Sequence, residues 1–327
     1  MEIKISEIKE LGVKVLIKHG YTTKESEEIF ESLLWSQRRE SSQGISKLFG
    51  WRIEKLPNAT SATIEKNEPN LLLVNANLNN HILACNLAVE EILKNIGQKP
   101  IFVAGVKNAV NSAGSIGYFT EKLAKAGLVS IMMSAADPGI STHGGSEAVF
   151  GTNPISIAVP TDSNPVLFDM SVASLTWGDL IKYDDVNKPL PEGFAFDESG
   201  EATTSAKAAM DGCVTSFDKS YKGSGLAMMI QILAGPLVGS LYSKNHTNCQ
   251  YGSLIIVINP SCFGDKKEFV NRVVSMVNEV KNSRKAKGFE EILIPGEGGY
   301  RNTNKHIGSV EIPEELYKKM TDFILGL

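Results

Sequence analysis

The sequence lacks the features that would place the protein in a membrane or in a disulfide-rich class. No stretch approaches the roughly 20 consecutive apolar residues of a membrane-spanning helix. Residues 2–18 alternate charged and apolar side chains, so they contain no hydrophobic core of a signal peptide. The four cysteines, Cys85, Cys213, Cys249 and Cys262, are widely spaced without a CxxC pair, which indicates neither a zinc site nor a redox motif. We therefore expect a cytoplasmic protein with reduced cysteines, no metal and no membrane partner.

An excess of positive charge is also missing. The chain has 33 Lys and Arg against 37 Asp and Glu, a net charge of -4, so it carries no electrostatic signature of nucleic-acid binding. No fixed-period repeat is present, which excludes a solenoid. What remains is an ordinary globular composition, 42% hydrophobic and 21% charged over 327 residues, long enough for a large core and two domains.

Interspersed helix and strand signals predict a mixed α/β fold. A helix should follow Thr22, where Glu25 completes a capping box. A second helix should carry apolar residues from Ile82 to Ile96 and stop at Gly97. Two more helices are expected, one after Lys222 through Leu237 and one over 266–281. Short apolar runs predict strands at 101–104, 128–133, 155–159, 166–168, 254–258 and 292–294. The polar stretch 183–212 is the longest candidate loop and could fold over a site.

The glycine-rich segments do not form a Rossmann fingerprint. Gly223-Ser224-Gly225 lacks the third glycine and follows Lys222 rather than a clear strand. A lysine beside glycines at a helix start can hold a phosphate through its charge and free N–H groups, although an ordinary helix start has the same appearance. Asp169 follows an apolar strand, a position that suits either a ligand crevice or a helix cap.

The motifs taken together resemble a known family. Their order and spacing from about Lys14 to about Glu314 are similar to those of the malate/L-lactate dehydrogenase family, which is distinct from the classical lactate dehydrogenases, and most of all to ureidoglycolate dehydrogenases. The matching segments are Gly114-Ser115-Ile116-Gly117-Tyr118-Phe119, Ala136-Asp137-Pro138, Gly144-Gly145, Gly151-Thr152-Asn153-Pro154, Phe168-Asp169-Met170, Trp177-Gly178, Tyr221-Lys222-Gly223-Ser224-Gly225-Leu226, Ile258-Asn259-Pro260 and Pro295-Gly296-Glu297.

The resemblance implies an NAD- or NADP-dependent oxidoreductase with a mixed-sheet, non-Rossmann fold and a helical subdomain. Its substrate would be a small carboxylate, namely a 2-hydroxy acid, a 2-keto acid or a cyclic imino acid. The protein would be a homodimer in which one subunit helps to form the other's site. We expect a discontinuous helical, dimerisation and substrate subdomain of residues 1–65, 108–127 and 313–327, and an α/β cofactor-binding domain of residues 66–107 and 128–312.

The resemblance also implies roles for particular residues. The cofactor would contact Asp169, Met170, Ser171, Val172 and Lys222. The turn Ser42-Gln43-Gly44 falls where the family has Ser-His-Gly, and Lys47 falls at its substrate-binding arginine. Lys47 keeps the positive charge that a carboxylate needs, but it lacks the two-pronged geometry of a guanidinium group.

Several positions depart from the family pattern. Ser112 replaces the histidine that exchanges the proton accompanying hydride transfer, and Gln43 replaces a second histidine. A serine hydroxyl does not titrate near neutrality, so losing this acid should slow the reaction by about 100- to 10,000-fold. Asp179 stands where a lysine is usual. Val172 and Ala173 replace hydroxyl-bearing residues, and the segment 217–220 replaces a stretch rich in glycine or alanine.

The five histidines offer one candidate replacement. His19, His246 and His306 have the surroundings of surface or turn residues, and His81 opens a helix. His143, beside Gly144-Gly145, is a candidate acid on the cofactor side, with a plain turn residue as the alternative. Two functions therefore stay open: an active oxidoreductase with an atypical site, or a catalytically silent paralogue that acts as a cofactor-binding or regulatory subunit.

Overall fold

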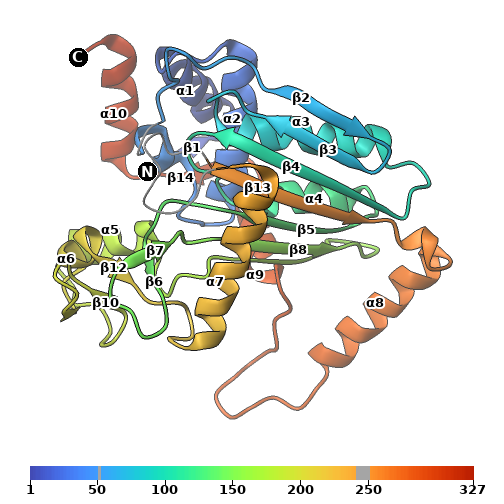
Figure 1. Cartoon of the computed structure of the whole chain (residues 1–327). Helices are drawn as coiled ribbons and strands as arrows, with labels where there is room; N and C mark the ends of the chain where they lie inside the picture. Colours follow the sequence, from blue (N-terminus) through green and yellow to red (C-terminus); the bar gives the residue numbers. More distant parts are fainter. Residues whose placement is uncertain (51–52, 241–250) are drawn as a thin grey trace.

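The computed structural model describes residues 1–50, 53–240 and 251–327, so the expectations for His246 and Cys249 lie outside the described residues. The mixed α/β prediction is confirmed. The centre is a seven-stranded sheet in the order β2-β3-β4-β13-β5-β8-β9, in which only β3 and β4 are parallel (Figure 1). Its strands are β2 Thr63–Glu68, β3 Leu71–Asn75, β4 Ile101–Ala109, β5 Val129–Ser134, β8 Ile155–Val159, β9 Val166–Met170 and β13 Tyr251–Ile258.

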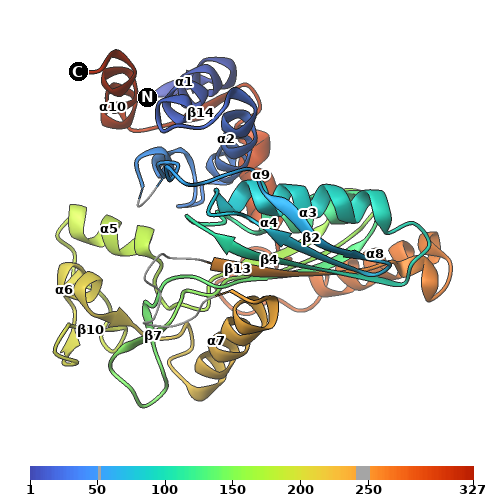
Figure 2. The same ribbon diagram turned by 45° about the horizontal axis from the view of Figure 1, so that its top comes forward.

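Helices lie on both faces of this sheet. Helices α3 (His81–Asn95) and α4 (Gly117–Lys125) pack on one face, and α7 (Tyr221–Ala234) crosses the other at one end (Figure 2). The central strands are apolar on both faces, as expected for strands covered by helices. Because its neighbouring strands are mostly antiparallel, the sheet is not a doubly wound parallel Rossmann sheet.

A helical layer joins the two chain ends. Helices α1 (Ile5–Lys18), α2 (Thr23–Arg38) and α10 (Glu314–Leu325) pack together beside a two-stranded sheet of β1 (Glu2–Lys4) and β14 (Ser309–Glu311). The capping box of Thr22 and Glu25 is present at the start of α2. The short helix η1 (Ile45–Phe49) follows α2. The division of the chain into the two discontinuous domains stays a prediction.

A small five-stranded sheet lies next to one end of the large sheet. Its order is β11-β10-β12-β6-β7. The strands are β6 Ile140–Ser141, β7 Ala148–Phe150, β10 Ala195–Phe196, β11 Ala202–Thr203 and β12 Cys213–Val214, with helices α5 Trp177–Asp185 and α6 Ala206–Asp211. The expectation of a long loop over 183–212 is therefore wrong in part, because buried Leu190, Ala195 and Ala209 of this polar segment pack into a hydrophobic cluster that also includes residues of β5, α7 and β13.

Two further expectations are wrong. Residues 292–294 form no strand but part of the connection between α8 (Lys266–Lys281) and α9 (Glu297–Lys305). Leu237 is not in α7, which ends before Gly235, and it falls in the separate turn η2 (Pro236–Val238) because Pro236 cannot continue the helix. His19 lies in the turn after α1, as expected for a surface or turn residue, and its ring is buried against Phe323 with centroids 4.7 Å apart.

Among the described residues, no helix is long and apolar enough to cross a membrane. Helix α8 begins after the turn η4 (Pro260–Cys262) and stands beside the sheet in Figure 1. None of its residues is buried, although its sequence repeats apolar side chains at helical spacing. The single chain therefore leaves the apolar side of α8 open.

Candidate active site

The turn after α2 carries the first predicted site residues. Gln37, in the last turn of α2, accepts the Ile45 N–H through its side-chain oxygen at 3.0 Å, which fixes the start of η1. Within the turn, the Gln43 N–H donates to Ser41 Oγ at 3.2 Å. Ser41 Oγ lies 3.3 Å from Ser115 Oγ, so this turn meets the loop that follows β4.

That loop contains Ser112, one of the predicted site residues. Ser112 is exposed, and its hydroxyl oxygen accepts the Gly114 N–H at 3.1 Å. The preceding Asn111 has a left-handed backbone with φ 68°, a conformation that asparagine tolerates better than most residues. The serine therefore stabilises its own tight turn while its side chain stays open to solvent.

Asp169 at the end of β9 faces the same loop. Its Oδ2 accepts the Gly117 N–H at 2.9 Å, at the start of α4. Glycine is required there, because a Cβ at position 117 would lie 2.7 Å from that oxygen. The two interpretations of Asp169 are thus compatible: it caps α4, a helix distant in sequence, and it borders the loop of Ser112.

The surroundings of Asp169 make it a weaker acid than usual. Burial by neighbouring protein atoms raises the pKa of this carboxyl to about 6, against opposing effects of the Gly117 N–H and of Arg39. The residue as a whole stays exposed. A carboxyl group that protein crowds on several sides loses part of its hydration even where water still reaches it. Asp169 is a group near the predicted site that can titrate close to neutral pH.

Helix α5 approaches the Ser41–Gly44 turn from the small sheet. A Cβ at Gly178 would lie 2.8 Å from the Cβ of Ser42, so glycine permits this close contact. The carboxylate of the neighbouring Asp179 is held by hydrogen bonds at the start of its own helix. Its Oδ2 accepts from the N–H and the hydroxyl of Thr176 at 2.9 and 2.6 Å, and Thr176 caps α5 in return. The Asp179 carboxylate therefore completes the local capping box of α5.

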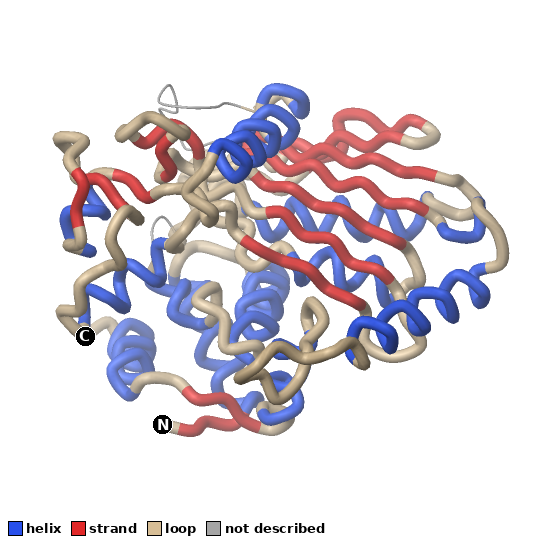
Figure 3. The backbone as a smooth tube through the Cα atoms, turned by 90° about the horizontal axis from the view of Figure 1, so that it is seen from below, coloured by secondary structure: helices blue, strands red, loops and turns tan. Residues whose placement is uncertain are grey.

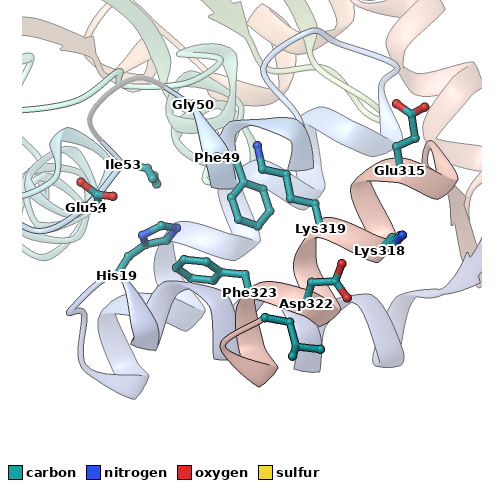
Figure 4. Close-up of a pocket in the computed structure, with 11 residues that line it drawn as sticks. His19, Phe49, Gly50, Ile53, Glu54, Glu315, Lys318, Lys319, Asp322 and Phe323 are labelled. Atoms are coloured by element: carbon teal, nitrogen blue, oxygen red, sulfur yellow. The ribbon is translucent and has the colours of Figure 1, made fainter.

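Lys47 lies in η1 and is largely surrounded by protein. Burial lowers the pKa of its ammonium group, and within the described part of the chain it has no carboxylate partner. Gly50 lies directly against it, since a Cβ there would be 3.5 Å from Lys47 Cδ. Gly50 also lines a cavity of about 590 Å³, which extends over Phe49 and Phe323 to α10 (Figure 4). Lys47 itself does not line this cavity.

The predicted cofactor residues after Asp169 continue into an irregular strand. Ser171 Oγ and the Val172 N–H both donate to the Thr152 carbonyl, at 3.0 and 2.9 Å. Met170 pairs with Ile155 at the end of β9, and the Val172 side chain is fully buried in the core. The Phe217 N–H donates to the Val172 carbonyl, so the segment leads from Asp169 to the start of α7.

The start of α7 is already occupied by a carboxylate of the chain itself. Asp218 accepts the Gly223 N–H at 3.2 Å and the Ser220 hydroxyl at 2.5 Å, and these hydrogen bonds, that of Ser220 first, lower the pKa of Asp218 to about 2. The Lys222 N–H donates to Ser220 Oγ at 3.1 Å, while the Lys222 side chain is exposed. The N–H groups that could have met a phosphate are therefore paired internally.

His143 lies beside this helix start, and none of its described contacts is with Ser112. Its N–H donates to Ser224 Oγ at 2.9 Å, and its ring meets that of Tyr221 with centroids 6.4 Å apart. The predicted residues thus form two groups. Ser42, Gln43, Ser112 and Asp169 are linked through the loop after β4, whereas His143 and Lys222 lie at the start of α7, with residues 170–173 between the two groups.

The sequence alone did not reveal some contributors to this site. Arg39 is held between the rings of Trp35 and Tyr300, at 4.3 and 4.2 Å, and acts on Asp169 from there. No local pattern signals such a contact. Asp218 could have been recognised, because an acidic residue just before a helix start is a common cap.

The chain combines a mixed α/β fold outside the Rossmann class with a weakly acidic carboxyl group beside the Ser112 loop. It also has a partly buried lysine that has no carboxylate partner among the described residues. The chain belongs to the malate/L-lactate dehydrogenase family, whose model matches residues 3–321.

Similarity to individual proteins agrees with this assignment. The chain is 35% identical to L-sulfolactate dehydrogenase of Methanocaldococcus jannaschii over 252 residues, 75% of this chain and 71% of that protein. It is 30% identical to the Delta(1)-pyrroline-2-carboxylate/Delta(1)-piperideine-2-carboxylate reductase of Pseudomonas aeruginosa over 80% of this chain and 81% of that protein. It is 30% identical to ureidoglycolate dehydrogenase (NAD(+)) of Escherichia coli O157:H7 over 72% and 69%. The solved structure of sulfolactate dehydrogenase from M. jannaschii superposes with a TM-score of 0.87 at 29% identity, covering 99% and 96% of the two chains.

Proposed function

We propose that the protein is an NAD(P)-dependent oxidoreductase that interconverts a small 2-hydroxy acid and 2-keto acid, or reduces a cyclic imino acid, with Asp169 in place of the usual histidine as the proton carrier. The observation that carries this proposal is the Asp169 carboxyl at the Ser112 loop, with a pKa of about 6. A group that gains and loses a proton near neutrality meets the requirement that serine cannot meet. Family membership supports the reaction class.

Lys47 is the proposed anchor for the substrate carboxylate. Its ammonium group is largely buried without a counter-charge from the described residues, so a bound carboxylate would pair with it. Lysine binds as a point charge, which tolerates more than one orientation of an anion.

The residues present fit a dinucleotide in part. Asn111 Oδ1 is buried and has no hydrogen-bond partner among the described residues, and a carboxamide N–H would satisfy it. The N–H groups at the start of α7 are paired within the chain, the Gly223 N–H with Asp218. A phosphate would therefore be contacted by the Lys222 side chain rather than by these N–H groups. When bound, the nicotinamide would supply or accept the hydride. Asp169 would give the proton to the substrate oxygen or nitrogen in reduction and remove it in oxidation.

A titration with NADH and NADPH, followed by a hydride-transfer screen, tests this function. The intrinsic fluorescence of the protein should change on binding one of the two cofactors, and reduction of at least one 2-keto or imino acid should follow. The alternative, a silent cofactor-binding or regulatory subunit, is favoured by the loss of histidine at Ser112. It predicts cofactor binding without turnover on any such acid. Absence of binding would contradict both.

Lys222→Ala should weaken cofactor binding. If a charged hydrogen bond to a phosphate is lost, the binding free energy should fall by about 1.5–3 kcal/mol. The fluorescence titration measures this change, and the exposed Lys207 of α6, changed to alanine, is the control. Unchanged affinity in Lys222→Ala would place the phosphates elsewhere.

Asp218→Asn should have the opposite effect. The change removes a negative charge from the helix start where Lys222 lies, so we expect cofactor affinity to rise by about two- to fivefold, more at low salt. Asp265→Asn is a matched control, because Asp265 caps α8 through the Glu268 N–H without a role in the site. Equal or weaker binding by Asp218→Asn alone would show that this carboxylate does not oppose the cofactor.

We also propose that the protein is a homodimer through α8 and the open face of the large sheet. On that face a row of apolar side chains crosses six strands, formed by Leu71, Val103, Ile256, Ile131, Ile157 and Phe168. Leu71 and Phe168 at its ends are exposed. Figure 3 looks onto this face, which α7 covers at one end only. Met276 and Val280 of α8 are likewise exposed, and a second copy would cover both surfaces.

Met276→Glu should convert the dimer to a monomer at micromolar concentration. The side chain is 60% exposed in the single chain, so the change costs the monomer little, whereas a charge buried in an interface is strongly unfavourable. Size-exclusion chromatography with light scattering measures the mass. Asn271→Glu, on an exposed position of the same helix, should remain dimeric. A monomeric unmodified protein would contradict the proposal.

A further inference from the structure

Buried polar groups hold the turn that carries Ser112. The Val110 N–H donates to the Asn79 carbonyl at 3.0 Å, and the His81 N–H donates to the Val110 carbonyl at 2.9 Å. These bonds bind the end of β4 to the start of α3. The next residue, Asn111, takes the left-handed conformation that turns the chain toward Ser112. The position of residue 112 therefore depends on what holds Asn111.

Tyr21 holds the side chain of Asn111. Its hydroxyl accepts the Asn111 Nδ2 at 3.1 Å and the Asn80 Nδ2 at 3.2 Å, and it donates to the Ile53 carbonyl at 2.9 Å. Tyr21 is 3% exposed and Asn111 is 6% exposed, so water does not replace these bonds easily. Because Asn111 Oδ1 has no partner in the described chain, the Tyr21 hydroxyl is its side-chain anchor.

His81 holds the backbone of the same residue. Its side chain hydrogen-bonds to the Asn111 backbone, and its Nε2 lies 2.9 Å from Ser253 Oγ. Burial lowers the pKa of His81 to about 4, which keeps the ring neutral at ordinary pH. The ring also lies parallel to that of Tyr251, 6.4 Å away.

We propose that Tyr21 and His81 are positioning residues, which fix the Asn111 turn and so hold the side chain at position 112 at the proposed active site. This inference rests on the proposed function for its catalytic consequence. Neither residue lies among the contacts of Ser112, Asp169 or Lys47 described above. Both act through Asn111: Tyr21 holds its side-chain amide, and His81 holds its backbone.

Amide hydrogen exchange tests the positioning directly and needs no substrate. Tyr21→Phe removes the hydroxyl and keeps the ring, and exchange within residues 106–118 should become about tenfold faster, with β13 unchanged. His81→Leu should act in the same way, and His81→Gln, which keeps a donor and an acceptor, should restore part of the protection. Tyr317→Phe removes the partly exposed hydroxyl that bonds Glu7 and should change nothing in this segment. Unchanged exchange in both Tyr21→Phe and His81→Leu would overturn the proposal.

Kinetics separate positioning from general stability. With any 2-keto or imino acid that the protein or its Ser112→His variant reduces, Tyr21→Phe should lower kcat about tenfold and leave the KM for that acid, whose carboxylate is assigned to Lys47, within about twofold. Equal changes in kcat and in the KM for the acid would contradict a positioning role. If no variant reduces any substrate, the proposed dehydrogenase function fails, and the exchange result still decides whether Tyr21 and His81 fix the turn.

Discussion

Ser112→His, alone or together with Gln43→His, is expected to create or raise the reduction of a small 2-keto acid by about tenfold or more. An imidazole at position 112 would supply a group that titrates near neutrality, and a general acid contributes about 100- to 10,000-fold to such reactions. Two features of the structure are consistent with such a gain. Residue 112 is exposed, and the Gly117–Asp169 contact holds a carboxyl group beside the same loop.

Two further variants complete this experiment, Ser163→His as a control and Asp179→Lys. Ser163→His adds an imidazole at an exposed loop before β9 and should add no activity. Asp179→Lys would introduce the positive charge expected from the family resemblance, but it should raise the reduction rate only slightly. It removes the carboxylate that completes the capping box of α5, a loss of about 0.5–2 kcal/mol in helix stability. We therefore expect the Ser112 and Gln43 changes to account for most of the recovery.

A negative result would be informative. If the single and double variants bind cofactor yet reduce no 2-keto or imino acid, while the unmodified protein turns over another substrate, the site has been rebuilt for different chemistry. If neither form turns over anything and both bind cofactor, the silent-paralogue alternative is supported. The two outcomes differ only in the behaviour of the unmodified protein, which is measured in the same screen.

The sequence predicts the regular parts of this fold because local rules dominate there. The capping box at Thr22 and the apolar spacing over 266–281 have no competing signal, and both helices are found. The apolar run at 292–294 has the composition of a strand but pairs with no strand among the described residues, so it remains an irregular connection. Burial of His19 depends on stacking with Phe323 near the other end of the chain, and no local pattern reveals such a contact.

The site is less predictable than the fold, because its chemistry depends on contacts between distant segments. A helix start at Lys222 could be read from the sequence, but not that Asp218 would turn its carboxylate onto the Gly223 N–H. Asp169 could be placed at a strand end, yet its raised pKa depends on the protein atoms that enclose it and on Arg39. The residue roles assigned from family resemblance, those of Ser42, Gln43, Lys47 and His143 among them, stay predictions.

Asp169→Asn should reduce any hydride-transfer activity of the unmodified protein by about 100- to 10,000-fold, because asparagine keeps the shape of the side chain but carries no exchangeable acid proton. The side-chain oxygen of the introduced asparagine can still accept the Gly117 N–H, so the cap of α4 should survive and the fold should be retained. Asp162→Asn is the matched control, since Asp162 is an exposed carboxylate in the loop before the same strand. Activity within a few-fold of the unmodified protein would exclude Asp169 as the proton carrier.

The pH profile gives the same carboxyl a second, independent signature. Reduction needs Asp169 protonated, so its kcat/KM should fall as pH rises through about 6, whereas the kcat/KM of oxidation needs the carboxylate and should rise through the same midpoint. Stability should follow the sign of the shift. The folded protein holds this proton more tightly than the unfolded chain, whose pKa is near 3.8, so Asp169 makes unfolding easier as pH rises from about 4 to about 6. Asp169→Asn should remove that part of the dependence in chemical denaturation, while Asp162→Asn should leave it in place. If both the rate midpoint and the stability profile are the same in Asp169→Asn and in the unmodified protein, the titrating group lies elsewhere and the proton path must be reassigned.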